Sequence, residues 1–338
     1  MQRLRGRTHF PAWLGLAVVL FASSAWGQYQ SLNLVSDLSG KALHTDPLLK
    51  NAWGLAYAPG NPFWISDEAN GWSTLYDGKG NPQSLQVIVP PASGPGSGSP
   101  TGIVYNASTE FKIDSWTSVF LFATLDGTIS GWSAFNPSSA LIAVTTPGAS
   151  YTGLAITNYS SGNSIFAADA ANNKVDVYDG SFNLVTSFTD PAVPAGFAPF
   201  GIQDINGKVF VSFAATNGGP GGFIDIFSES GTLEKHFTHG KPLNQPWGFA
   251  IAPKNFGPLS NTLLITNNAT AGTINGYELS TGKLVGTMTN TSGKPLVING
   301  IWGIEFGGGS AENGQRNQLF FTSGPNDTDG YFGVITFK

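Results

Sequence analysis

Residues 153–180 read GLAITNYSSGNSIFAADAANNKVDVYDG, and they show the pattern on which the rest of the chain is built. A glycine and an apolar residue come first, and further short apolar runs follow, separated by Asn, Asp, Ser and Gly. Short runs rich in β-branched and aromatic residues, bounded by turn-forming residues, are typical of strands joined by tight turns. No run keeps an apolar period of 3.6 residues, which predicts few helices.

The opening of this stretch recurs along the whole chain. A glycine followed by an apolar residue stands at six places, whose glycines are separated by 48, 51, 48, 47 and 55 residues. The six instances are Trp53-Gly54-Leu55, Thr101-Gly102-Ile103, Thr152-Gly153-Leu154, Phe200-Gly201-Ile202, Trp247-Gly248-Phe249 and Trp302-Gly303-Ile304. Four antiparallel strands per repeat, arranged radially, form a β-propeller. The sequence therefore predicts an all-β, six-bladed β-propeller over residues 28–338, with blades that start near residues 53, 101, 152, 200, 247 and 302.

The recurring glycine has a steric explanation, because the first strands of all blades converge on the axis and leave no room for a side chain. The sixth repeat offers only three strand-like runs, at 302–306, 318–322 and 332–337. The run SLNLVS at 31–36 precedes the first repeat and has no other partner. We expect this N-terminal strand to close the ring as the outer strand of the last blade, which pairs an edge that would otherwise be exposed.

Residues 1–27 have the layout of a signal peptide. Three arginines, Arg3, Arg5 and Arg7, precede an apolar stretch over about 12–22, and Ala25 and Gly27 stand before a predicted cleavage site at Gln28. The sequence thus predicts a secreted or periplasmic protein. The apolar stretch is shorter than the roughly 20 residues of a spanning helix, and we expect no membrane span in the mature chain.

Composition excludes several classes of function. The chain has no Cys, which removes disulfide scaffolds, thiolate metal sites and thiol nucleophiles. Charged residues make up only 11% of the chain and the formal net charge is −5. Nucleic-acid binding needs clustered Lys and Arg, so we expect no nucleic-acid partner. We expect a monomer.

Polar residues are concentrated in two sets of loops, those that join second to third strands and those that join one blade to the next. These loops share one face of a propeller, so Asp67, Asp126 and Asp169 are candidate metal ligands there, and carboxylates suit Ca²⁺. The candidates for acid–base catalysis are Asp67, Asp169, His44 and His239. Asp is also a good turn former, and that alternative stays open.

Aromatic residues form a second candidate set. Trp53, Phe200, Trp247 and Trp302 directly precede the axial glycine in four repeats. Together with Asn267, which follows the second strand of the fifth repeat, they are the predicted ligand-binding residues. An aromatic ring at this place can stack on a ligand at the channel rim or pack between blades as core.

Residues 153–180 resemble NHL-type repeats, on Asp169, Asn172, Asn173, Val175, Val177, Tyr178 and Asp179. With the segments AWGLAYAP, QPWGFAIAP and GIWGIEFG, residues 30–338 are similar to a family of secreted bacterial propeller proteins of unassigned function. More distantly, the chain resembles gluconolactonases, paraoxonase-like esterases and virginiamycin-type lyases. The lactonase resemblance implies a divalent ion held by Glu, Asn and Asp in the channel. The chain departs from that pattern because no Glu starts an inner strand; Glu68 and Glu305 are the nearest.

These observations predict a protein that binds an extracellular glycan, peptide or small molecule at the loop-rich axial face. This is the face that the loops between second and third strands share with the loops between blades. A metal-assisted hydrolase, lactonase or lyase that uses the channel carboxylates is the alternative. A structural or surface-assembly role is the second alternative.

Overall fold

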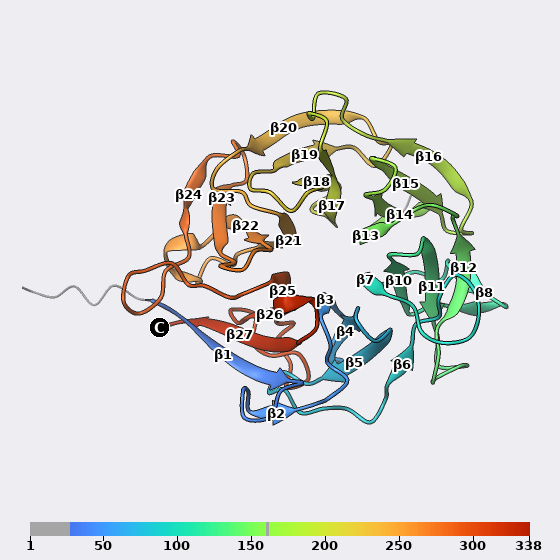
Figure 1. Cartoon of the computed structure of the whole chain (residues 1–338), viewed down its shortest axis with the longest axis horizontal. Helices are drawn as coiled ribbons and strands as arrows, with labels where there is room; N and C mark the ends of the chain where they lie inside the picture. The colour runs from blue at the N-terminus through green and yellow to red at the C-terminus, as the bar shows by residue number, and fades with distance from the viewer. Residues whose placement is uncertain (1–27, 160–161) are drawn as a thin grey trace, which may run out of the picture.

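The computed structural model describes residues 28–159 and 162–338. Six small sheets stand around a common axis in this part of the chain (Figure 1). In the first five blades, neighbouring strands pair antiparallel and leave the axis in sequence order. The predicted six-bladed β-propeller is therefore confirmed. The predicted signal peptide, residues 1–27, lies outside the described residues.

The inner strands begin within three residues of the predicted blade starts. The first blade consists of β3 (Ala52–Tyr57), β4 (Phe63–Asp67), β5 (Trp72–Tyr76) and β6 (Val87–Ile88). The second consists of β7 (Pro100–Tyr105), β10 (Phe120–Thr124), β11 (Thr128–Trp132) and β12 (Leu141–Thr145). The third consists of β13 (Tyr151–Tyr159), β14 (Gly162–Asp169), β15 (Lys174–Asp179) and β16 (Leu184–Phe188). A small hairpin of β8 (Lys112–Ile113) and β9 (Trp116–Thr117) interrupts the second blade.

The next two blades have the same order. They consist of β17 (Phe197–Asp204), β18 (Val209–Ala215), β19 (Phe223–Phe227) and β20 (Leu233–His239); and β21 (Pro246–Ile251), β22 (Thr262–Asn267), β23 (Ile274–Glu278) and β24 (Leu284–Thr287). The only helical segments among the described residues are two single 3₁₀ turns, η1 (Gly257–Leu259) and η2 (Pro325–Asp327). No helix in this part of the chain is long and apolar enough to cross a membrane.

The last blade is completed from the other end of the chain. Its own strands are β25 (Ile301–Phe306), β26 (Leu319–Ser323) and β27 (Tyr331–Phe337), and β1 (Tyr29–Ser36) pairs antiparallel with β27. A short β2 (His44–Thr45) then adds in parallel to β1. The predicted closure by the N-terminal strand is confirmed, and the strand is two residues longer than expected.

Buried side chains hold β1 in this place. Leu34 and Val35 pack in one apolar cluster with Phe332 and Val334. The Tyr29 hydroxyl donates to the carbonyl of Phe256 at 2.6 Å and accepts from the amide of Leu259 at 3.0 Å, so β1 also contacts the fifth blade.

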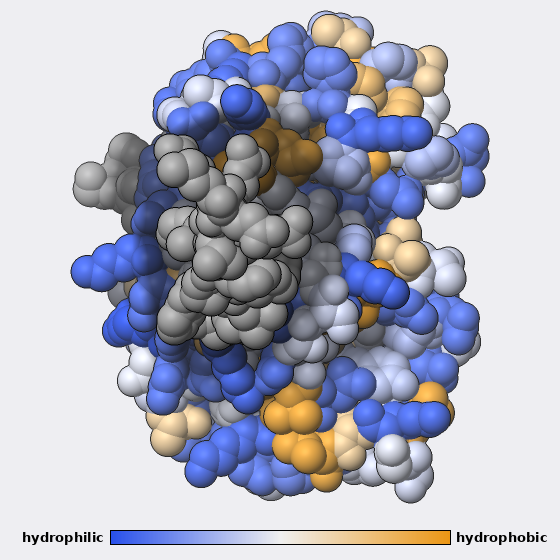
Figure 2. All heavy atoms as spheres, turned by 90° about the vertical axis from the view of Figure 1, so that its left-hand side faces the viewer, coloured by the Kyte–Doolittle hydropathy of each residue, from blue (hydrophilic) through white to orange (hydrophobic). Residues whose placement is uncertain are grey.

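The side of the ring seen in Figure 2 is mostly hydrophilic, with hydrophobic residues in small patches.

A hydroxyl group joins neighbouring inner strands in three successive blades. Ser212 of β18 accepts the amide of Gly201 at 2.8 Å and donates to the carbonyl of Pro246 at 2.6 Å. Thr266 of β22 makes the same pair of bonds with the amide of Gly248 and the carbonyl of Trp302, both at 2.8 Å. These side chains occupy the points where the inner strands bulge away from their own ladders, between Pro199 and Ile202 and between Pro246 and Phe249.

The same bridge closes the ring. Thr322 of β26 accepts the amide of Gly303 at 2.9 Å and donates to the carbonyl of Trp53, so the last blade is bonded to the first. The inner strands are so close that a Cβ built on Gly201 would lie 2.0 Å from the carbonyl oxygen of Trp247. A Cβ on Gly54 would lie 2.3 Å from the carbonyl oxygen of Thr101. This contact confirms the steric explanation of the recurring glycine.

We expect Val35→Ala to lower the free energy of unfolding by about 2 kcal/mol, because it leaves a cavity under a fully buried position of β1. Leu32→Ala on the same strand is the matched control, since Leu32 is 48% exposed and its truncation should cost less than about 0.5 kcal/mol. Denaturant unfolding followed by circular dichroism measures both. Equal costs would show that β1 does not hold the last blade.

We expect Thr266→Val to cost about 2 kcal/mol, because it leaves the buried amide of Gly248 and the carbonyl of Trp302 without a partner. Thr266→Ser keeps the hydroxyl and should cost less. The two variants are compared by their urea midpoints. A Val variant as stable as the Ser variant would contradict the role of the bridge.

Candidate functional site

The axis is filled at the loop-rich end by aromatic rings. Trp53, Trp247 and Trp302 are buried and pack together with Phe200 and Leu125. The rings of Trp53 and Trp302 are stacked at a centroid distance of 3.6 Å. The structure thus brings the four predicted aromatic residues together, but their rings face one another, as in the core alternative.

Hydrogen bonds fix two of these indoles. Trp247 Nε1 donates to the carbonyl of Thr152 at 2.8 Å, and Trp302 Nε1 donates to Asn51 Oδ1 at 3.3 Å. Trp53 Nε1 is buried with no hydrogen-bond partner among the described residues. Because four blades contribute one ring each, the cluster separates the loop-rich face from the rest of the channel.

A cavity of about 520 Å³ occupies the other end of the axis, where the inner strands end. All six inner strands line it. Its walls are apolar at Leu55, Ile103, Ile156, Phe249 and Ile304, and polar at Tyr57, Gln203, Asp204, Asn206 and Glu305. Apolar and polar side chains thus share the lining, and a concave site that offers both can hold a small molecule.

Glu305 is the unusual group in this cavity. It lies on β25, and burial raises the pKa of its carboxyl from 4.5 to about 8. Tyr57 lies near it and donates from its hydroxyl to the carbonyl of Phe306 at 3.0 Å. Burial and then the charge of Glu305 raise the pKa of Tyr57 to about 12. The cavity therefore holds a carboxylic acid that changes charge close to neutral pH.

The sequence contained a signal for this residue. Two positions after the axial glycine, four repeats have Ala or Val, whereas the fourth repeat has Gln203 and the sixth has Glu305. A comparison of the repeats at that position would have selected Glu305. The lactonase resemblance implies a Glu at the start of an inner strand, whereas Glu305 lies near the end of β25, at the opposite end of the channel from the loop-rich face.

The three predicted metal ligands are not brought together. Asp67 is fully buried, burial holds the pKa of its carboxyl well above its usual range, and neither carboxyl oxygen has a hydrogen-bond partner among the described residues. Asp126 accepts hydrogen bonds from the amide of Ala92 and the hydroxyl of Thr124.

Asp169 has the contacts of a turn former. It accepts the amides of Ser150 and Asn172, at 3.0 and 3.2 Å, and the side-chain amide of Asn172 at 2.7 Å. No group of metal-ligating side chains among the described residues contains any of the three predicted ligands, Asp67, Asp126 and Asp169.

The remaining predicted residues are also separate. His44 lies on β2, where it pairs with Val35. His239 is exposed, and its ring stacks with Phe223 at a centroid distance of 5.9 Å. Asn267 is buried; its amide donates to the carbonyl of Pro242 at 2.8 Å, and its carbonyl oxygen accepts the amide of Asn244 at 3.0 Å. These hydrogen bonds of Asn267 hold the loop between the fourth and fifth blades.

A cavity does open on the predicted face, beside the axis. It has a volume of about 590 Å³ and lies among loops of the fourth, fifth and sixth blades. Its polar lining includes Asn244, Gln245, Asn268, Asn326 and Asp327. It contains none of the candidate site residues named above, and its walls come from loops, whereas strands from every blade form the axial cavity.

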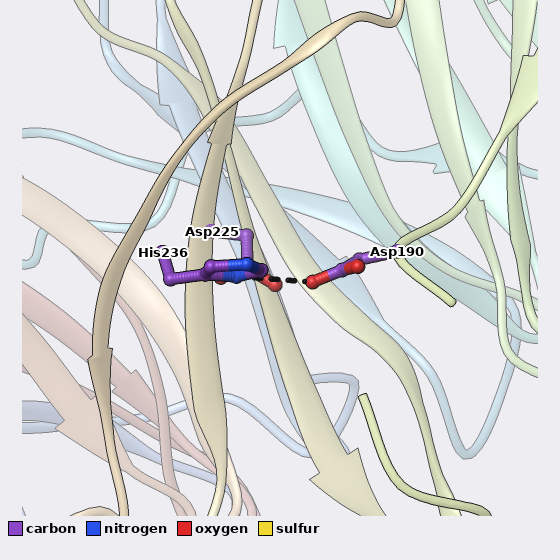
Figure 3. A group of neighbouring side chains, drawn as sticks. All are labelled: Asp190, Asp225 and His236. Atoms are coloured by element: carbon purple, nitrogen blue, oxygen red, sulfur yellow. Dashed lines mark hydrogen bonds and ion pairs between the residues drawn. The ribbon is translucent and has the colours of Figure 1, made fainter. Parts of the chain in front are cut away.

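One group of side chains has the composition of a metal site. Asp190, Asp225 and His236 converge between the third and fourth blades (Figure 3), and their ligand atoms lie within 4.8 Å of one another. Burial and the neighbouring Asp190 raise the pKa of Asp225 to about 7, whereas His236 lowers it. The sequence did not reveal this group, because Asp190 belongs to a loop between blades while the other two lie on neighbouring strands.

Comparison with known proteins gives a family. No protein-family model matches the chain, so the likeness to NHL repeats stays a resemblance. The "Uncharacterized protein R648" of Acanthamoeba polyphaga mimivirus is 30% identical over 330 residues, which cover 89% of this chain and 78% of the viral protein. The chain belongs to the R648 family. This relative is viral, so the comparison does not support the bacterial family that the sequence suggested.

Two solved structures show how widely the R648 family's fold is shared. A gluconolactonase from Xanthomonas campestris matches with a TM-score of 0.57 and 14% identity, over 92% of this chain and 90% of its own. A streptogramin B lyase matches with a TM-score of 0.55 and 15% identity, over 94% and 100%. At such identities the likeness shows the fold alone.

We expect Glu305→Gln to change how stability depends on pH. The wild-type carboxyl has a pKa of about 8 when folded and an ordinary value of 4.5. Its contribution to stability is therefore full below pH 4.5 and is lost as the pH rises toward 8. The Gln variant should lose less stability than the wild type over that interval. Thermal unfolding from pH 4.5 to 8.5 measures this dependence of stability on pH. Glu312→Gln, at an exposed position, is the control. Parallel curves of Tm against pH for the wild type and Glu305→Gln would refute the burial of this charge.

Proposed function

We propose that the protein is an exported propeller that binds a small extracellular ligand in the axial cavity at the ends of the inner strands. The observation that carries this proposal is a cavity of about 520 Å³, lined by all six inner strands, with the carboxyl group of Glu305 in its wall. Its size lies in the usual range of ligand sites, roughly 300–1,000 Å³. Export is supported by the sequence of residues 1–27.

The lining favours a ligand with an apolar body and hydrogen-bonding groups. Leu55, Ile103 and Phe249 offer apolar surface, which a free sugar would cover poorly. Glu305 and Gln203 offer hydrogen-bonding groups at equivalent positions of two blades. Short apolar peptides and glycosides with an apolar substituent combine both properties, so they are the glycan and peptide classes that fit this cavity.

The test is a calorimetric titration of the wild-type protein with a panel of apolar tripeptides and alkyl glucosides. Ile156→Trp should abolish binding because the larger side chain fills the cavity, and Glu305→Gln should weaken it about tenfold by changing a hydrogen bond in a desolvated site. Asp327→Asn is the matched control in the loop-rich cavity and should leave affinity unchanged. Loss of binding in Asp327→Asn alone would move the site to the loop-rich face. No binding to any probe would favour the structural role.

A second candidate is a hydrolase or lyase. It is favoured by the pKa of about 8 at Glu305, because a carboxyl group that is protonated at neutral pH can donate a proton to a leaving group. A metal-assisted form, with Ca²⁺ as its cation, would need further ligands beside Glu305. Chromatography of the titrated probes decides between the two functions, since an enzyme would convert a bound probe and a binding protein would return it unchanged.

A further inference from the structure

Three elements meet at the boundary of the third and fourth blades. Asp190 follows β16 in the loop that crosses to β17, Asp225 lies on β19, and His236 lies opposite Asp225 on β20. His236 Nδ1 is 3.1 Å from Asp190 Oδ2 and 3.1 Å from Asp225 Oδ1. Figure 3 shows Asp190 approaching the other two side chains from the opposite side. One nitrogen and two oxygens thus surround a common point.

The charges at this point are not balanced. Both carboxyl groups are buried, and His236 is the only basic side chain within 4 Å of either among the described residues. A protonated imidazole would neutralise one carboxylate and leave the other, which is costly in a buried site. Asp225 Oδ2 is also buried without a hydrogen-bond partner in this part of the chain. The group therefore lacks a positive charge and a partner for a buried oxygen.

The equivalent positions of the neighbouring blades carry no surplus negative charge. In the third blade, Asp176 forms an ion pair with Lys174 at 2.8 Å and accepts the hydroxyl of Ser187 at 2.5 Å. In the fifth blade the position is the neutral Asn275, which accepts the hydroxyl of Thr287 at 2.7 Å. Asp225 occupies the same place in the fourth blade with a histidine opposite it and a second carboxylate beside it. Among the three blades compared, the unbalanced negative charge occurs only in the fourth.

We propose that Asp190, Asp225 and His236 bind one divalent transition-metal ion of the zinc class, which fastens the crossing loop to the fourth blade. Ligands about 2.0–2.2 Å from a tetrahedral metal lie roughly 3.4 Å apart, close to the separations of the imidazole nitrogen from the two oxygens. The mixed N and O set suits Zn²⁺ better than Ca²⁺, which takes six to eight oxygen ligands. His236 is 57% exposed, so water can complete the coordination and the ion can enter from solvent.

This site is separate from the proposed ligand cavity, which none of the three residues lines. The metal would act on stability, because it binds the folded state and because its ligands come from a loop and two strands. Failure of either proposal would leave the other unaffected.

The experiment uses tag-free protein treated with EDTA and then titrated with Zn²⁺, Co²⁺ or Ca²⁺. We expect one equivalent of Zn²⁺ by elemental analysis after desalting. Zn²⁺ at about 100 times its Kd should raise the Tm by about 4 °C. Ca²⁺ should give no rise. Co²⁺ should give the absorption bands of a nitrogen- and oxygen-ligated ion.

Variants tie the effect to these residues. His236→Gln and Asp225→Asn should lose both the bound ion and the rise in Tm. Two matched controls should keep them: His239→Gln, an exposed histidine three residues away, and Asp176→Asn, the equivalent position in the third blade. Wild-type protein that takes up no Zn²⁺ would overturn the proposal. So would a rise in Tm that survives in His236→Gln. Because His236 is exposed, misfolding is a poor explanation for loss of the ion in this variant.

Discussion

The close approach of the inner strands is the constraint on which the rest of the structure depends. The strands lie so near the axis that a Cβ on Gly201 would meet the next strand at 2.0 Å. Hydroxyl groups of Ser212, Thr266 and Thr322 then bond three of the bulged inner strands to their neighbours. Since these bonds are buried and pass from blade to blade, the blades hold one another in position.

This narrow waist also explains the different character of the two ends of the channel. Before the glycine, the strands carry Trp or Phe in four blades, and these rings meet and fill the axis. After it, the strands diverge, and small side chains such as Ala56 and Ala250 leave a cavity. Glu305 stands where those blades have a small residue, so its carboxyl lies in the cavity wall, among both apolar and polar side chains.

Much of the fold could be predicted from the sequence because it repeats. The spacing of the glycines gave the number of blades, and the missing strand of the last repeat gave the partner of β1. The site could not be predicted in the same way, because good turn formers and good ligands are the same residue types. Asp169 shows this, since its oxygens accept hydrogen bonds from Asn172 of its own turn and from Ser150 in the loop before β13. The approach of Asp190 to Asp225 depends on the path of a loop between blades, which no local pattern encodes.

The shared fold gives little guidance on chemistry. Propellers similar to this chain include a gluconolactonase and a streptogramin B lyase, yet at this level of identity only the ring is comparable. In this chain the aromatic cluster occupies the axis at the loop-rich end, so function has to be argued from the cavity behind it.

Hydrogen–deuterium exchange, followed by mass spectrometry on peptides from β1 and from the six inner strands, tests the closed ring most directly. If blades support one another around the axis, amides of β1 and of all inner strands exchange together at the slow rate set by global unfolding. Exchange of β1 or of any one inner strand orders of magnitude ahead of the others would contradict a ring that opens only as a whole.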